Sequence, residues 1–264
     1  MKRYTNKSRI KKIKVLKNNK DKVFFAEIIK EPLKNILKEV QPQAIKEIRE
    51  LVIKSWGDFE EDYLRKRVLD VYLLCLLRDV KNNLIGITPI KKIKVFDRYV
   101  YSFGLSVVDP NYQGLGLLKK MSTILIRRLF CENLLKGRTK LEFVFITPNI
   151  RTMGTLAKVA NFIYPNPYLF DEETRKIPEA DSETLRTVKE FLKITKENCR
   201  KLEKEGCIME GFYDTHPHLI VKEKREHSDK KLNSFAKTYL YNKPGREIVV
   251  RAILSIRSIL KNES

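Results

Sequence analysis

Apolar residues in the first part of the chain fall into short runs and helical stripes. The run at 23–29 predicts a strand. Apolar positions within 45–52 repeat at helical spacing, so we expect a helix that starts near Pro42 and ends at Gly57. A shorter helix is expected at 60–69. The chain therefore begins with a strand followed by helices.

The next segment has the pattern of an antiparallel meander. The run at 71–77 predicts a buried strand, and 84–88 with 92–96 predicts a return strand that is interrupted at Pro89. A third strand is expected at 99–108. Because the turns between these runs are short and polar, we expect hairpin connections.

The clearest helical pattern covers 116–133. Its apolar residues stand on one face: Leu117, Leu118, Met121, Ile124, Leu125 and Leu129. A strand at 141–146 follows this helix. The strand–helix–strand unit predicts a parallel pair of strands joined by a crossover.

The rest of the chain is less regular. We expect a helix at 151–160, a short strand at 162–164, and a helix that starts at Ser182 and ends at Gly206. Residues 248–260 fit a strand or a helix. The elements together predict an α/β (α+β) fold with a mixed, mostly antiparallel central sheet and helices on both faces.

Charge is distributed unevenly along the sequence. The 264 residues include 54 Lys and Arg against 33 Asp and Glu, a net charge of +21. Residues 1–22 contain ten basic residues and one acidic residue, a net of +9, and are expected to form a basic, flexible tail. This balance favours nucleic acid or an acidic partner. The alternative is a solvated tail in a lysine-rich protein, and no aromatic-rich nucleic-acid motif is present.

Membrane insertion, secretion and metal binding are disfavoured. No apolar run approaches the ~20 residues of a membrane span, and no apolar segment of a signal peptide follows the basic start. We expect a cytoplasmic protein that binds no membrane. The spacing of Cys199, Cys207, His216 and His218 fits no common zinc pattern, so we expect no metal site.

The segment with recognisable chemistry is 105–121, which reads LSVVDPNYQGLGLLKKM. A strand ends at Asp109-Pro110, Gly114 and Gly116 follow, and an amphipathic helix begins. Glycine lets the backbone approach a ligand closely, and unpaired N–H groups at the start of a helix attract phosphate. The pattern predicts an anion-binding loop. It is neither a Walker motif nor a complete dinucleotide fingerprint.

This loop resembles motif A of the GCN5-related N-acetyltransferase (GNAT) superfamily, which is [QR]-x-x-G-x-[GA] after a strand ending in V-x-P. Val108-Asp109-Pro110 matches the strand end, and Gln113-x-x-Gly116 matches the loop. Leu118 stands where the family has Gly or Ala. A bulkier residue there narrows the pocket or shifts the pyrophosphate.

A second match lies downstream. The family has a strand, an Asn, and a helix that ends in G-F; here Asn149 and Asn161-Phe162 correspond, with Asn in place of the usual Gly. The order of elements across 23–164 also fits. The resemblance implies a GNAT-like acyl-CoA N-acyltransferase domain at 23–170. The C-terminal extension at 171–264 would complete the sheet, cover the acceptor or mediate a homodimer.

The resemblance also implies how acetyl-CoA binds as a cosubstrate. Backbone groups of Val107 and Val108 would pair with the pantetheine arm, backbone N–H groups of the loop would hold the pyrophosphate, and Asn149 would contact the cofactor from the other side. The implied binding residues are Val107, Val108, Gln113, Gly114, Leu115, Gly116, Leu117, Leu118, Lys119 and Asn149.

The general acid and base are less defined. Many relatives use a Tyr five residues before the final Phe, and that position here is Ala157. Tyr164 and Tyr168 are the alternative acids, unless they only pack, and Glu142 is the candidate base, unless it faces solvent. The implied reaction is direct attack of an unidentified amine on the thioester. The alternative function is an inactive GNAT-like protein that binds nucleic acid or another polyanion.

Overall fold

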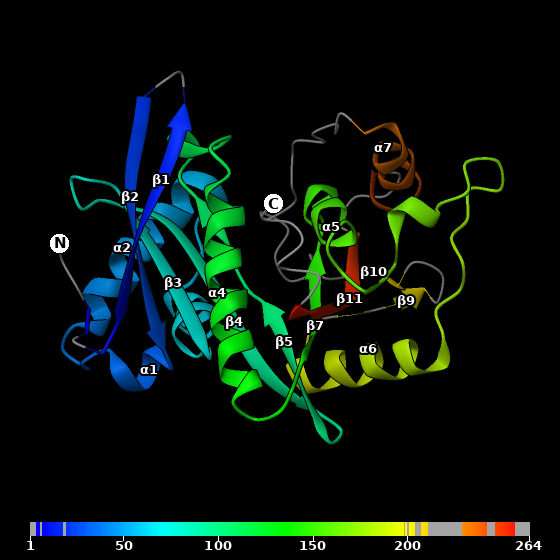
Figure 1. Ribbon diagram of the computed structural model, residues 1–264, viewed down its shortest axis with the longest axis horizontal. Coiled ribbons are helices and arrows are strands. Elements are labelled where there is room, and N and C mark those ends of the chain that lie inside the picture. Colours follow the sequence, from blue (N-terminus) through cyan, green and yellow to red (C-terminus); the bar gives the residue numbers. More distant parts are fainter. Residues whose placement is uncertain are drawn as a thin grey trace. The chain divides into compact units, whose positions relative to one another are not determined.

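The protein is described by a computed structural model that covers residues 4–5, 7–17, 20–197, 199, 201–203, 207–210, 229–241 and 246–256. The chain divides into two compact units (Figure 1). Unit 1 comprises 1–92 and 103–132, and unit 2 comprises 93–102 and 133–264. These units do not follow the predicted boundary at residue 170.

Unit 1 combines an antiparallel sheet with helices. Its elements are β1 (Arg9–Lys17), β2 (Lys20–Lys30), α1 (Pro32–Asn35), α2 (Gln41–Ser55), α3 (Glu61–Leu64), the π-helical turn η1 (Arg65–Leu69), β3 (Leu73–Arg78), β4 (Leu84–Val95, whose last three residues belong to unit 2), β6 (Val107–Val108), the 3₁₀ turn η2 (Pro110–Tyr112) and α4 (Leu117–Leu134, whose last two residues belong to unit 2). The strand order is β1-β2-β3-β4, and β6 pairs with β4. Every neighbouring pair is antiparallel.

Strand β3 forms the core of unit 1. All six of its residues are buried, so both faces of this strand are covered, and it lies between β2 and β4 in the sheet. The predicted interruption at Pro89 is wrong, since Pro89 lies inside the continuous strand β4. Its carbonyl accepts a hydrogen bond from the Gly104 N–H at 3.0 Å. A Cβ on Gly104 would lie 3.0 Å from the Pro89 ring, so glycine permits this close approach.

The predicted flexible tail is wrong for the residues that the structure describes. Arg9–Lys17 forms β1, which pairs with β2 along its whole length. Ile13 and Val15 alternate with exposed lysines and are buried, which gives the strand one apolar side. The buried Tyr4 hydroxyl donates to Glu47 of α2 at 2.5 Å. The sequence analysis interpreted the many lysines and arginines as a flexible tail and so missed this alternation of apolar and basic residues.

Unit 2 has a mixed sheet. Its elements are β5 (Arg98–Phe103, whose last residue belongs to unit 1), β7 (Lys140–Thr147), α5 (Ile150–Ala157), β8 (Phe162–Tyr164), the 3₁₀ turn η3 (Pro167–Leu169), α6 (Ser182–Thr195), β9 (Lys201–Glu203), β10 (Ile208–Glu210), α7 (Lys230–Ala236), the π-helical turn η7 (Lys237–Tyr241) and β11 (Glu247–Ser255). The strand order is β5-β7-β11-β10-β9, and β8 pairs with β11. Strands β5 and β7 are parallel, which confirms the predicted crossover pair. The other pairs are antiparallel.

Several predicted boundaries need correction. The strand expected at 99–108 is two strands, β5 and β6. They are separated at Gly104, whose backbone N–H donates to the Pro89 carbonyl. Helix α6 is capped by Asp181, whose carboxylate accepts the Thr184 N–H, and it ends at Thr195 rather than at Gly206. Of the segment 248–260, which fits both patterns, residues 248–255 belong to the strand β11 (Glu247–Ser255), which pairs with β7 and is nearly all buried. Residues 257–260 lie outside the described part of the chain.

The mixed, mostly antiparallel sheet with helices confirms the predicted fold class. No helix in the described part of the chain is long and apolar enough to span a membrane. Likewise, the described residues include no cluster of three or more His, Cys, Asp or Glu that would hold a metal ion. Cys199 and Cys207 lie within the described residues, whereas His216 and His218 lie outside them.

Candidate functional site: an anion-binding loop in unit 1

Asp109 starts the loop between β6 and α4. Its backbone N–H donates to the Ile85 carbonyl of β4 at 2.9 Å, which fixes the end of β6. Its buried carboxylate accepts the Asn111 N–H at 2.9 Å and thereby caps η2. The Lys54 ammonium lies 3.7 Å from the same carboxylate. Asp109 therefore shapes the turn.

Two glycines carry the chain from η2 into α4. Gly114 and Gly116 have φ angles of +78° and +66°, in the left-handed region that glycine adopts without strain. An added Cβ at either position would meet no atom within 4 Å. Between and after them, Leu115 and Leu117 are buried and anchor the loop to unit 1. The glycines are therefore needed for backbone conformation and leave open space beside the loop.

The backbone amides of this loop are available to a ligand. Within the described residues, the N–H groups from Gly114 to Lys119 have no protein acceptor, and the first amide with one is Lys120, which donates to the Gly116 carbonyl at 3.1 Å. The first turn of α4 contains no acidic residue. Amides at a helix N-terminus, together with the positive end of the helix dipole, bind phosphate. Leu118 is only half-buried at this turn.

The two valines of β6 differ in whether their backbone groups are available to a ligand. Because Asp109 bonds Ile85 and Val107 pairs with Ile87, the alternation of an antiparallel ladder directs the backbone groups of Val107 toward β4. The prediction that Val107 pairs with a ligand is therefore corrected. Val108 directs its N–H away from β4, while its carbonyl accepts from the Gln113 side chain at 3.3 Å.

Four residues that sequence reasoning missed support the loop: Tyr112, Asp79, Asn83 and Ser55. The Tyr112 hydroxyl donates to Asp79 at 3.1 Å, and Asp79 also accepts from the side chain of Asn83 at 2.9 Å. Burial and the bond to Asp79 raise the pKa of Tyr112. Ser55, the last residue of α2, donates to the Val108 carbonyl at 3.4 Å. The aromatic residue just before the glycines was the only sequence signal for this support.

Unit 2 contains Asn149, which was predicted to contact the cofactor from the other side, and the candidate acids Tyr164 and Tyr168. The Asn149 side chain accepts the Arg151 N–H at 2.9 Å and caps α5. Tyr164 is buried in β8, where it lies opposite Arg251 of β11. Tyr168 follows in η3, and its buried hydroxyl has no hydrogen-bond partner within the described residues. Asn149 and Tyr164 thus have structural roles within unit 2.

Glu142 is engaged in ion pairs. One carboxylate oxygen lies 2.7 Å from Nε of Arg98, and the other lies 2.7 Å from Nε of Arg251. The side chains of Glu142 and Arg251 are 12% and 4% exposed. Arg251 also donates to Glu183 and Thr184 of α6 at 2.8 Å, which links β7 and β11 to that helix. A carboxylate held by two guanidinium groups is a poor general base, so the catalytic prediction for Glu142 is corrected.

The buried arginine was another residue that the sequence analysis missed. Its signal is a single charged residue inside the apolar run of β11, which reads EIVVRAILS. A charge at such a position requires a partner, because an unpaired buried charge is costly.

Comparison with known proteins gives structural matches only. No protein-family model and no curated protein matches the sequence. The chain is similar to GNAT-family N-acetyltransferases of known structure. A GNAT N-acetyltransferase from Escherichia coli in complex with CoA is 18% identical over 39% of this chain and 57% of its own, with a TM-score of 0.30.

Two further structures extend this comparison. A GNAT acetyltransferase from Brucella melitensis in complex with acetyl-CoA is 18% identical over 45% of this chain and 74% of its own, with a TM-score of 0.30. The ribosomal-protein-S18-alanine N-acetyltransferase from Escherichia coli is 12% identical over 88% of this chain and 94% of its own, with a TM-score of 0.34. Similarity at this level does not transfer an activity, so the function below depends on the chain's own residues.

Proposed function

We propose that this protein is an N-acyltransferase that takes an acetyl group from acetyl-CoA and transfers it to an amine. The observation that carries the proposal is the row of amides from Gly114 to Lys119, before and in the first turn of α4, which have no acceptor in the part of the chain that the structure describes. A diphosphate carries several acceptor oxygens and a negative charge, which is what this row of donors and the helix dipole complement. The row lies within the segment that resembles motif A, which supports the proposal.

The residues of the loop would hold the cosubstrate as follows. The amides of Gly114 to Lys119 bind the diphosphate, and the Lys119 ammonium adds attraction for the negative charge. The outward N–H of Val108 is the backbone donor available to the pantetheine arm. Acetyl-CoA supplies an activated thioester, and holding it beside an amine supplies the proximity on which direct transfer depends.

Proton transfer needs a donor for the departing thiolate. The amine nitrogen forms a bond to the thioester carbon, the carbon–sulfur bond breaks, the nitrogen loses a proton and the sulfur gains one. The buried Tyr168 hydroxyl has no hydrogen-bond partner among the described residues, whereas the Glu142 carboxylate is held by two arginines. We therefore retain Tyr168 as the proposed general acid.

Calorimetry with the full chain tests the proposal. Titration with acetyl-CoA should give saturable heat, whereas acetylpantetheine, which lacks the diphosphate, should bind much more weakly because it cannot use the loop amides. No heat with acetyl-CoA at high micromolar protein would overturn the assignment. Equal binding of the two compounds would show that the loop is not a diphosphate site.

The β1–β2 hairpin supports a second function, binding of the phosphate backbone of a nucleic acid. Lys30 of β2 pairs with Glu132. Six other exposed cations in or just before the hairpin have no ion pair with any described carboxylate; they are Lys7, Arg9, Lys11, Lys12, Lys14 and Lys22. Residues two apart on a strand lie about 6.6–6.8 Å apart on one side, so Lys12 and Lys14 form a row of like charge. Such a row attracts a linear polyanion. Lysines on an edge strand also prevent pairing with other chains.

The salt dependence of nucleic-acid affinity tests whether these lysines bind a polyanion or only protect the edge strand. If the hairpin binds nucleic acid, the affinity for a duplex should fall steeply with salt, and the Lys11→Gln/Lys12→Gln/Lys14→Gln variant should reduce the logarithmic slope by about two to three. The matched control replaces three exposed lysines of unit 2, Lys136, Lys158 and Lys189, by Gln. Undetectable binding at low salt, or the same slope in both variants, would contradict this role.

A further inference from the structure

A tyrosine side chain joins the anion-binding loop of unit 1 to a distant turn of the same unit. Tyr112 is the last residue of η2 and lies two residues before Gly114. Its hydroxyl donates at 3.1 Å to the carboxylate of Asp79, which is 33 residues earlier in the chain and directly follows β3. This bond therefore connects the entrance of the loop to the turn between β3 and β4.

Asp79 is itself held in place by its turn. Its carboxylate accepts the backbone N–H of Asn83 at 2.8 Å and the Asn83 side chain at 2.9 Å, and Asp79 is only 7% exposed. Burial opposes ionisation, but the hydrogen bonds from Asn83 and Tyr112 outweigh it and hold the pKa of the Asp79 carboxyl below its usual value. At neutral pH Tyr112 donates to a charged acceptor of fixed position, which gives a stronger hydrogen bond than a neutral acceptor does.

The ring and backbone of Tyr112 are fixed as well. The ring packs edge-on against Phe24 of β2, with the ring centroids 6.0 Å apart. The Tyr112 N–H donates to the Asp109 carbonyl at 2.9 Å, and the next amide, that of Gln113, donates to the Pro110 carbonyl at 3.3 Å. The position of Tyr112 is therefore passed along the backbone to the start of the two-glycine segment.

The loop needs this support at its entrance. Leu115 and Leu117 are buried and anchor the part that leads into α4. Gly114 and Gly116 have no side chain to hold them, and glycine has more conformational freedom than any other residue. A loop that must become ordered when its ligand binds loses affinity, so a contact that orders it beforehand raises affinity.

We propose that Tyr112 is a positioning residue for the diphosphate: its hydroxyl, held by Asp79, keeps the amides from Gly114 to Lys119 in the arrangement that binds the ligand. This inference rests on the proposed acetyl-CoA site. It adds that the affinity for the cosubstrate depends on a hydroxyl whose own bond is to the protein.

Titration calorimetry of Tyr112→Phe tests this role in the full chain. The variant keeps the ring beside Phe24 and removes only the hydroxyl, so acetyl-CoA should bind about tenfold more weakly, on the scale of one hydrogen bond to a charged group. Acetylpantetheine, which lacks the diphosphate, should bind the parent and the variant equally. An equal loss for both compounds would show that Tyr112 supports unit 1 in general, and the positioning role would be wrong.

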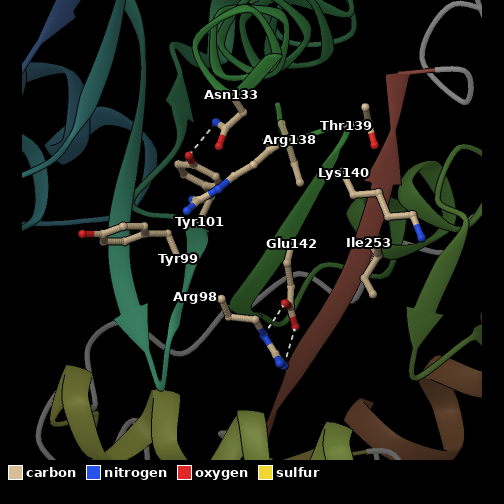
Figure 2. Close-up of a pocket in the computed structure, with 10 residues that line it drawn as sticks. Arg98, Tyr99, Tyr101, Asn133, Arg138, Thr139, Lys140, Glu142 and Ile253 are labelled. Atoms are coloured by element: carbon tan, nitrogen blue, oxygen red, sulfur yellow. Dashed lines mark hydrogen bonds and ion pairs between the residues drawn. The ribbon is translucent and has the colours of Figure 1, made fainter. Parts of the chain in front are cut away.

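A second tyrosine provides a matched control. The Tyr101 hydroxyl of unit 2 accepts from the Asn133 side chain at 2.8 Å, and both residues are buried (Figure 2). Tyr101→Phe leaves a buried donor without its acceptor and should lower the melting temperature at least as much as Tyr112→Phe, yet it should not change the affinity for acetyl-CoA. If Tyr101→Phe weakened acetyl-CoA as much as Tyr112→Phe, the loss would follow stability alone and contradict the proposal.

A double-mutant cycle tests whether the hydroxyl acts through Asp79. Asp79→Ala should weaken acetyl-CoA binding, and adding Tyr112→Phe should cause no further loss, whereas additive losses would contradict the coupling. If the parent chain gives no heat with acetyl-CoA, the proposed function fails and this inference fails with it. If the parent binds acetyl-CoA and Tyr112→Phe binds it equally well, this inference alone is wrong.

Discussion

Gly116→Asp should weaken acetyl-CoA binding by about a hundredfold, while Gly116→Asn should retain most of it. Gly116 has a φ of +66°, and an added Cβ would meet no atom within 4 Å. Asn and Asp both tolerate this left-handed conformation, so the two variants differ mainly in charge. A carboxylate close to a diphosphate at a protein surface costs roughly 3 kcal/mol, which corresponds to the expected loss.

Titration calorimetry of the two variants beside the parent chain measures this difference. Circular dichroism melts serve as the folding control, because neither side chain displaces a neighbour and both variants should melt close to the parent. Equal affinity of the Asp and Asn variants for acetyl-CoA would show that no phosphate lies beside Gly116. That outcome would remove the main support for the acyltransferase.

Arg251→Ala should lower the free energy of unfolding by about 3 kcal/mol. Its guanidinium is 4% exposed and lies 2.7 Å from Glu142, so the alanine variant leaves a mostly buried carboxylate with one partner fewer. The contacts with Glu183 and Asp181 are expected to add little, because those side chains are 62% and 54% exposed.

Chemical denaturation measures this effect, with Lys189→Ala as a surface control that should stay within about 0.5 kcal/mol of the parent. Glu142→Gln should be destabilising as well, and folded Glu142→Gln should bind acetyl-CoA like the parent. If instead Glu142→Gln kept full stability and lost acetyl transfer alone, Glu142 would be the base that the sequence suggested, and its structural role would be wrong.

Local patterns predicted most of the elements, and the errors have specific physical causes. The helix at 116–133 and the strand at 141–146 were recognisable because each has a clear period, and they match α4 and β7. The tail was mistaken because β1 buries only alternate positions between lysines. Pro89 was expected to interrupt the strand, yet it lies inside β4. Gly104 packs against its ring and has no Cβ that would crowd it.

In the candidate site, too, local features were predictable from the sequence, whereas contacts between distant residues were not. The spacing of Gly114 and Gly116 before an amphipathic helix predicted a loop with free amides, because helix geometry itself leaves the first amides without acceptors. The structure shows such amides among the described residues, and anion binding by them stays a prediction. Glu142 could not be assigned from the sequence, since its partner Arg251 is more than one hundred residues away along the chain.

The sequence by itself determined most of the strands and helices and the two-glycine loop, since these depend on residues close together along the chain. Only the tertiary structure decided which polar groups are already used. It placed the Val107 backbone in a ladder with β4, bound Glu142 between two arginines, and joined Tyr112 to Asp79. The physical reason is that a hydrogen bond or an ion pair joins groups according to their positions in space, which the order of residues does not specify.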